Sequence, residues 1–394
     1  MTTFFSAGFR PFFLFAGLYG TFPLVVWIAA LAGEASLPGP MSALAWHGHE
    51  MVFGFGVAGL AGFLLTAVPS WTSTPPVKGL PLAGLAVLWV MGRAAMWGGW
   101  GLGADIVAIA DLALLVALVS VLGTKIIACG QARNYPLIAL VVTLLIANAL
   151  MHLETLEFLE NSAATGLRLG LYVFCLLVAL IGGRVIPAFT TNVLKVRGDA
   201  TEVGSVAIIE KLTAFALIMA IALDLALPDA GSGRIAAGLV AVFAGLVLVA
   251  RMARWRLVKI LNEPILWILH MGHVWLALGF ILKGLADVTG LVNSGDAIHA
   301  LSAGAMGTMI MAMMTRAALG HTGRPMKAPP MIVTAYMLVL GGALLRVVGP
   351  MLAGFFAGDV ESAIIATGGL MWVGGFAIFS IIFWPILTRP RVDS

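Results

Sequence analysis

Charged side chains are scarce in this sequence. Asp, Glu, Lys and Arg make up 10% of its 394 residues, whereas a soluble domain has about a quarter of its residues charged. Hydrophobic residues make up 61% of the chain, and the mean hydropathy is +1.05. These values exclude an ordinary soluble domain. They predict an all-α protein with many helices embedded in a lipid bilayer.

Cysteine is almost absent as well. Cys129 and Cys175 lie in different segments, so the chain has no disulfide framework, and no C-x-x-C-H motif is present for covalent haem. A phosphate-binding G-x-x-x-x-G-K-[ST] loop and a dinucleotide-binding fingerprint are also missing. The formal net charge is +4, but Lys and Arg are spread singly, which argues against a nucleic-acid partner. Any haem would therefore be b-type and held non-covalently.

Long apolar runs dominate the rest of the chain. Because crossing the hydrocarbon core takes about 20 apolar residues, we expect about twelve transmembrane helices. They lie near 12–32, 47–68, 80–100, 104–126, 135–153, 167–187, 206–227, 234–252, 264–285, 297–318, 331–353 and 361–387. Most Lys and Arg residues fall at one set of helix ends, so the positive-inside rule places these ends, and both termini, in the cytoplasm.

The chain also has a weak internal match. Sliding the second span onto the tenth by 250 positions pairs His49 with His299 and Gly54 with Gly304. A proline near the inner surface opens the first, fifth and ninth spans: Pro11, Pro136 and Pro264. We interpret residues 1–394 as a single polytopic membrane domain, and the match suggests three repeats of four helices, at 1–133, 134–261 and 262–394.

His47, His49 and Glu50 stand at the start of the second span. Such residues are costly at a membrane span unless they bind something. Residues i and i+2 of a helix differ by about 200° of rotation, so the two histidines face two neighbouring sites. We interpret these as a haem on one side and copper on the other, since imidazole binds both. The alternative is that the histidines lie among lipid headgroups and cap helices.

Four histidines lie near the outer surface in this topology: His47, His49, His152 and His299. The matching depths of His49 and His299 predict that they are the two axial ligands of haem b. His47 and His152 then remain for copper, with Glu50 or Glu154 as a further ligand or as a hydrogen-bonding partner of a ligand.

Two arginines lie within otherwise apolar spans. Arg93 and Arg346 follow the two histidine-bearing spans at similar distances. A buried guanidinium needs an anionic partner, and haem propionates would serve. The alternative partner is an acidic side chain such as Glu50, Asp105 or Asp111.

Three further histidines lie toward the inner side. His270 and His273 are three residues apart, so they share a helix face. With His321 they could form a second metal site or a proton path. His321 is also explained by a solvated turn, LGHTGRP.

Five strings carry a resemblance to a known family. They are GFRPFFL (8–14), WHGHEMVFGF (46–55), FLLTAVPSWT (63–72), GGRVIPAFTTN (182–192) and ALSAGAMGTMIMAMMTRAALGHTGRP (300–325). The chain resembles the NnrS family over essentially its whole length. The resemblance implies a bacterial inner-membrane protein that carries haem and copper and takes part in nitric oxide metabolism or in tolerance of nitrosative stress. It implies roles for the histidines in matching strings: His47, His49, His152, His270, His299 and His321. His273 stands where the family has other residue types.

The helix count, with a histidine on the second and tenth spans, is also similar to the catalytic subunit of haem–copper oxidases. The copper ligands of those enzymes lie on spans six and seven, which carry no histidine here. Two other functions remain open. Intramembrane charges and internal repeats are typical of a proton-coupled transporter, and a factor that delivers metal or haem to another membrane enzyme would need similar ligands.

Overall fold

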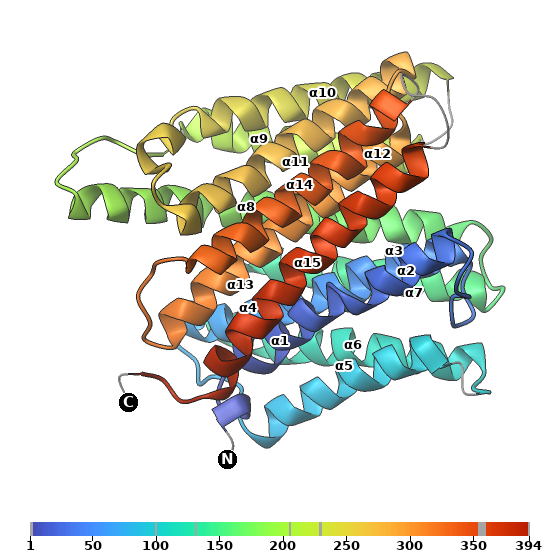
Figure 1. Cartoon of the computed structure of the whole chain (residues 1–394), viewed down its shortest axis with the longest axis horizontal. Coiled ribbons are helices and arrows are strands. Elements are labelled where there is room, and N and C mark those ends of the chain that lie inside the picture. The colour runs from blue at the N-terminus through green and yellow to red at the C-terminus, as the bar shows by residue number, and fades with distance from the viewer. Residues whose placement is uncertain are drawn as a thin grey trace. The chain divides into compact units, whose positions relative to one another are not determined.

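The computed structural model describes residues 3–98, 101–130, 132–204, 206–227, 231–353 and 360–392, and within these ranges every regular element is a helix (Figure 1). The α-helices are α1 (Phe9–Tyr19), α2 (Phe22–Leu31), α3 (Ala43–His49), α4 (Val57–Thr72), α5 (Leu80–Gly98), α6 (Ala104–Ala128), α7 (Tyr135–Thr155), α8 (Ser162–Val196), α9 (Ala207–Ala226), α10 (Gly231–Met252), α11 (Pro264–Thr289), α12 (Ser294–His299), α13 (Thr308–His321), α14 (Pro330–Ala353) and α15 (Val360–Thr388). Two π-helical segments, Glu50–Gly56 and Ala300–Gly307, join α3 to α4 and α12 to α13.

Eleven helical segments among the described residues are long and apolar enough to cross a membrane. They match eleven of the twelve ranges expected from the sequence, and the chain is a multi-pass membrane protein. The remaining range corresponds to α9, which carries Glu210, Lys211 and Asp224. Two of these charges are paired: Glu210 binds Arg251, and Asp224 lies 2.5 Å from the Nζ of Lys283. Charged side chains within membrane helices are usually paired in this way.

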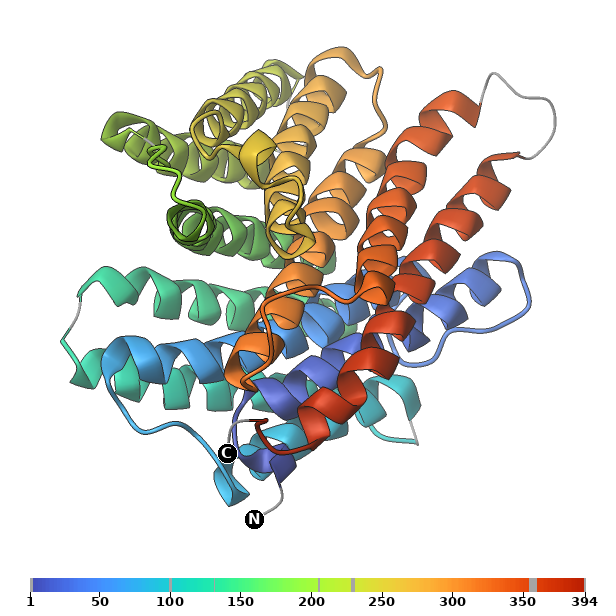
Figure 2. The same cartoon turned by 60° about the vertical axis from the view of Figure 1, so that its left-hand side comes forward.

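The two ends of the chain lie together (Figures 1 and 2). The Nη1 of Arg10 donates to the carbonyl oxygens of Leu387 and Arg389, at 2.9 and 2.7 Å. The backbone N–H of Val392 donates to the carbonyl of Thr322 at 3.1 Å. Since both ends lie on one side, the chain crosses the bilayer an even number of times, and we therefore count α9 as the twelfth span.

The chain forms two compact units that alternate along the sequence. Unit 1 contains residues 1–173, 313–326 and 376–394, and unit 2 contains residues 174–312 and 327–375. In unit 1, α4, α5 and α7 all pack against α6. In unit 2, α11 packs against α10 and against the π-helical segment Ala300–Gly307. The unit boundaries do not follow the repeat boundaries expected from the sequence, and the repeats stay a prediction.

Both π-helical segments begin directly after a histidine. One follows His49 and the other follows His299, so they start at positions 250 residues apart. A π-helical turn contains an extra residue, which redirects the side chains around it, and such turns occur frequently at functional sites. The internal match of the sequence is therefore accompanied by the same local change of helix geometry in each unit.

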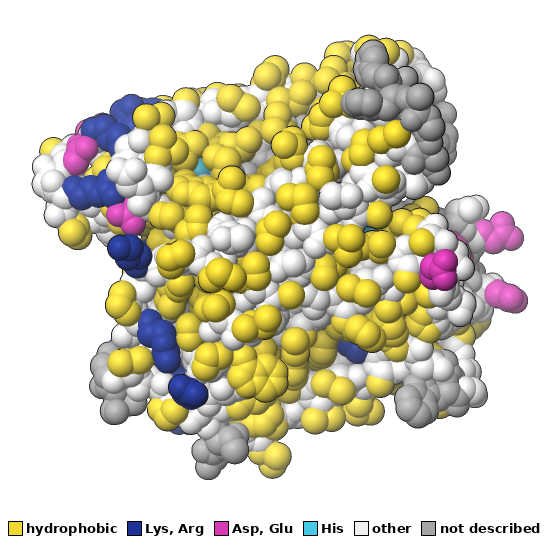
Figure 3. Space-filling model, viewed as in Figure 1, with side chains coloured by type: hydrophobic (Ala, Val, Ile, Leu, Met, Phe, Trp, Pro, Cys, Tyr) yellow, Lys and Arg dark blue, Asp and Glu magenta, His cyan; other side chains and the backbone are white. Residues whose placement is uncertain are grey.

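The visible surface agrees with a membrane location. Hydrophobic side chains cover the middle of the face drawn in Figure 3, and most of the charged side chains lie at its margins. This distribution leaves the helix sides for lipid and the helix ends for the aqueous phases.

Candidate metal centre

His47 and His49 point toward different neighbours, as the rotation between them predicts. The His47 ring stacks on Trp27, with 4.4 Å between the ring centroids. His49 is fully buried. Gly48 allows this helix to lie close to α8, because a Cβ atom there would lie 2.4 Å from a methyl carbon of Leu167. In the His-Gly-His sequence, the two rings therefore leave the helix in different directions, and the glycine between them allows a close contact with α8.

Both ring nitrogens of His49 face oxygen atoms. Its Nδ1 lies 2.7 Å from Oε1 of Glu50, and its Nε2 lies 3.0 Å from Oδ2 of Asp111 and 2.9 Å from Oδ1 of Asn148. Asn148 also donates to Oδ2 of Asp111 at 2.7 Å, which fixes the orientation of its amide. Asp111, in the second turn of α6, is the acceptor shared by these groups.

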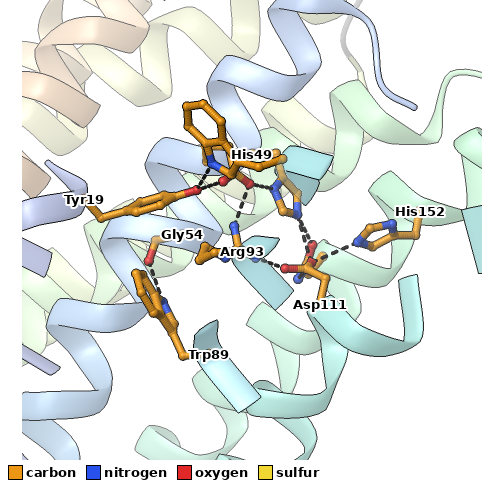
Figure 4. A network of polar contacts seen from close by, with 10 residues as sticks. Tyr19, His49, Gly54, Trp89, Arg93, Asp111 and His152 are labelled. Carbon is orange, nitrogen blue, oxygen red and sulfur yellow. Dashed lines mark hydrogen bonds and ion pairs between the residues drawn. The ribbon is translucent and has the colours of Figure 1, made fainter. Parts of the chain in front are cut away.

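His152 reaches the same carboxylate from α7. Its Nε2 lies 2.9 Å from Oδ2 of Asp111, while its Nδ1 is buried without a hydrogen-bond partner among the described residues. One ligand atom each from His49, Asp111 and His152 lies within 4.8 Å of the other two. Figure 4 shows these three side chains pointing toward one another from α3, α6 and α7. We call this group the His49–Asp111–His152 cluster.

Arg93 on α5 connects the cluster to a second acid. Its guanidinium pairs with Glu50 at 2.5 Å and with Asp111 (Figure 4). The other oxygen of Glu50 accepts from the hydroxyl of Tyr19, whose oxygen in turn accepts from the indole N–H of Trp97 at 2.6 Å. Two carboxylates thus face one guanidinium in a buried region. A proton or a metal ion at the histidines would compensate the remaining negative charge.

A small pocket adjoins the cluster. Asp111, Arg93 and Asn148 form its polar wall. Its other lining residues are apolar: Phe53, Val57, Trp89, Leu114 and Leu115. A pocket of this size holds about one water molecule.

A family model described as NnrS protein matches residues 3–391, which is nearly the whole chain. The chain belongs to the NnrS family. This result confirms the resemblance inferred from the five sequence strings. No curated protein matches this NnrS-family chain.

The fold of this NnrS-family chain has a counterpart among solved structures. It is similar to a haem–copper terminal oxidase that was determined as a dimer by cryo-electron microscopy, with a TM-score of 0.66 and 14% sequence identity. The match covers 98% of this chain and 85% of the oxidase chain. At this identity the likeness concerns the arrangement of helices alone.

Two residues predicted as haem ligands fall in different units of the NnrS-family chain. His49 belongs to unit 1 and His299 to unit 2, so axial ligation by this pair stays a prediction. The Nδ1 of His299 lies 2.7 Å from the carbonyl oxygen of Gly295. Donation from Nδ1–H to a backbone carbonyl is a feature of many histidines that bind metals.

The two arginines predicted to bind propionates both pair with acids. Arg93 binds Glu50 and Asp111, and Arg346 lies 2.7 Å from Asp296. This is the alternative that the sequence left open, and contacts with propionates stay a prediction.

The other predicted metal ligands are dispersed. Glu50 contacts His49 and Arg93 rather than His152. His321 is exposed and stacks on Phe9 in unit 1, whereas His270 is buried in unit 2. A site that uses both His270 and His321 therefore stays a prediction as well.

Asp111 and Asn148 are central to the cluster but were not predicted as site residues. Asp111 was considered only as a partner for Arg93. Its position within an apolar span is a signal in itself, because carboxylates there usually serve a function. Asn148 precedes His152 by four residues, so the two side chains share one face of α7.

Proposed function

We propose that this chain is a membrane metalloprotein in which the His49–Asp111–His152 cluster binds a transition-metal ion. The observation that carries the proposal is the meeting of two imidazoles and a carboxylate, all buried, with their ligand atoms within 4.8 Å. Imidazole and carboxylate ligands suit copper, iron and zinc. Membership of the NnrS family favours copper.

The surrounding residues support a stable ligand geometry. Arg93 holds Asp111 and Glu50, and Asn148 holds the shared Asp111 oxygen by a 2.7 Å hydrogen bond. Such contacts orient the ligating atoms, and the loss of one typically lowers metal affinity about 10–100-fold. A bound copper or iron ion would supply a centre that binds a diatomic molecule, and the small pocket beside Asp111 would hold that molecule.

Haem b is the second cofactor that we propose, with His299 as one axial ligand. The hydrogen bond from its Nδ1 to Gly295 suits this role. The pairing of His49 with His299 on the same haem competes with the cluster, because both would use the Nε2 atom of His49. Metal and haem analysis of His152→Ala and His299→Ala variants separates the two assignments.

The physiological role that we propose is the handling of nitric oxide or protection against nitrosative stress in the bacterial inner membrane. It is supported by membership of the NnrS family together with the small size of the pocket. Proton-coupled transport is the second candidate, because the buried network of Tyr19, Glu50, Arg93 and Asp111 could relay protons.

The test is an optical spectrum and metal analysis of the detergent-purified protein, oxidised and then reduced with dithionite, with nitric oxide added afterwards. We expect copper and a haem Soret band in the wild type. Asp111→Asn should lose the copper, whereas Asp105→Asn, on the exposed first turn of the same helix, should retain it. A folded, metal-free wild type that accumulates a substrate in proteoliposomes would favour transport instead.

A further inference from the structure

A second group of buried polar side chains lies in unit 2, around the first turns of α11. It contains His270 and His273, which are 1% and 0% exposed, and Trp255, which is 0% exposed. Both ring nitrogens of His273 and the indole nitrogen of Trp255 are buried and make no hydrogen bond within the described part of the chain. The Nε2 of His270 is also buried without a well-formed hydrogen bond, although the backbone of Trp255 interacts with that ring. Burying polar atoms without partners is costly, so the group calls for a ligand.

The two imidazoles have one neighbour in common, Trp255. They are one helical turn apart on the same face of α11. Both contact the same indole ring: the Trp255 centroid lies 6.1 Å from that of His270 and 4.8 Å from that of His273. Side chains at i and i+3 of one helix are known to share a metal ion in helical bundles.

A backbone carbonyl next to His270 favours the tautomer that a ligand needs. The Nδ1 of His270 lies 3.1 Å from the carbonyl oxygen of Leu266, one turn earlier. Donation from Nδ1–H to that carbonyl leaves the lone pair of Nε2 for a metal ion. His273 has two unpartnered nitrogens, so either can present a lone pair to the same ion.

His273 lies in a tightly packed environment. A Cβ atom at Gly182 of α8 would lie 2.3 Å from Cε1 of His273. With Trp255 against the same ring, His273 is enclosed by backbone and indole. The absence of a side chain at Gly182 is what allows the imidazole to occupy this position.

The charge around the pair points to a monovalent ion. Arg251 is a cation beside the pair, with its guanidinium 5.7 Å from the centroid of the Trp255 ring. Its Nε donates to Glu210 at 2.8 Å and its Nη1 donates to the carbonyl of Ala179 at 2.7 Å. Glu210 compensates Arg251, and no carboxylate of a described residue contacts either imidazole. A divalent ion would bring two uncompensated charges into a region of low dielectric constant, and a monovalent ion brings one.

We propose that His270 and His273 form a second metal site, separate from the His49–Asp111–His152 cluster, that binds cuprous copper through two imidazole nitrogens. The argument uses residues of unit 2 alone and does not depend on the function proposed for the cluster. Trp255 covers the site, and Gly182 makes room for it.

The test is an anaerobic titration of the detergent-purified protein with Cu(I) in competition with bicinchoninate. It compares the wild type with His270→Ala, His273→Ala and His273→Gln, and His321→Ala is the control because that ring is exposed. We expect His270→Ala, His273→Ala and His273→Gln each to remove one Cu(I) per chain, while His321→Ala removes none. His273→Met should keep the ion, because a thioether also binds Cu(I). Unchanged Cu(I) binding in folded His273→Gln overturns the proposal.

A second measurement uses a variant that should lack the ion of the cluster but keeps His270 and His273. Its result therefore depends neither on the cluster nor on the folding of the histidine variants. In Asp111→Asn, from which the ion of the cluster should be lost, X-ray absorption at the copper edge should show Cu(I) with two imidazole ligands. Trp255 fluorescence, assigned by comparison with Trp255→Phe, should be quenched by that Cu(I). A folded Asp111→Asn protein that takes up no Cu(I) refutes the second site. If Asp111→Asn binds as much metal as the wild type, and His152→Ala does too, the cluster assignment fails and the second site stands.

Discussion

The buried histidines of the two units have different neighbours. In unit 1, His49 and His152 meet Asp111, and a network of Glu50, Arg93 and Asn148 surrounds them. In unit 2, His270 and His273 meet an indole ring, and both ring nitrogens of His273 are unpartnered among the described residues. The first environment carries excess negative charge and the second is close to neutral. Ligand type and local charge together therefore predict a more highly charged ion in unit 1 and a monovalent ion in unit 2.

The largest effect should come from removing the shared carboxylate of unit 1. Asp111→Ala leaves Arg93 with one acidic partner and leaves two imidazoles facing an empty position. Breaking a buried ion network in this way costs about 3–5 kcal/mol. We expect a loss of cluster metal and a large fall in the thermal unfolding midpoint, both measured in detergent, while Cu(I) binding at His270 and His273 persists in the folded fraction. Equal losses at both sites would show that the two environments are not independent.

In unit 2, the feature most sensitive to substitution is the close packing of Gly182 against His273. Gly182→Ala places a methyl group 2.3 Å from Cε1 of His273. Overpacking of this kind costs about 1–3 kcal/mol, and the displaced ring should bind Cu(I) more weakly. The matched control is Gly84→Ala on α5, where an added Cβ meets no atom within 4 Å. That change should be neutral or stabilising by up to about 1 kcal/mol. Similar unfolding midpoints for the two variants would contradict the close contact at Gly182.

The neutrality of the unit 2 site can be tested through Glu210. Glu210→Gln leaves the buried Arg251 without its carboxylate, although Glu210 is 38% exposed and water screens part of the loss. We expect a destabilisation of about 1–2 kcal/mol and Cu(I) affinity at His270 and His273 lower by roughly tenfold, because the guanidinium charge is then uncompensated. The chelator competition measures the affinity, and Glu202→Gln, an exposed acid paired with Arg254, is the control. Unchanged Cu(I) affinity would remove charge as the reason for preferring a monovalent ion.

The helices could be predicted from the sequence because hydropathy is a local property. Each apolar run corresponds to a helix, and the rotation between His47 and His49 correctly predicted that they face different neighbours. The charged ends of α9 are paired with residues 41 and 59 positions away, at Arg251 and Lys283, and such pairing depends on how helices pack.

The cluster was predicted only in part, because its contacts also depend on how the helices pack. His152 was expected near a metal, but its partner was expected to be His47, and the structure brings it to His49 instead. The contacts of His49 with Asp111 and Asn148 join residues 62 and 99 positions apart. No periodicity in a single helix contains that information. The unpartnered atoms of His273 are likewise invisible in the sequence, which shows only that His270 and His273 share a face.

The smallest expected effect concerns His47, and it separates the sequence-based choice of copper ligand from the structural one. In the structure the His47 ring stacks on Trp27 at the partly exposed end of α3. Losing an aromatic contact of this kind costs about 0.5–1.5 kcal/mol. His47→Ala should therefore lower the unfolding midpoint slightly and leave the copper content unchanged, whereas His152→Ala should remove the copper of the cluster. Metal analysis of the two variants distinguishes the two assignments. A loss of copper in His47→Ala with retention in His152→Ala would place the copper site on the Trp27 side of α3, because the rings of His47 and His49 leave that helix in different directions.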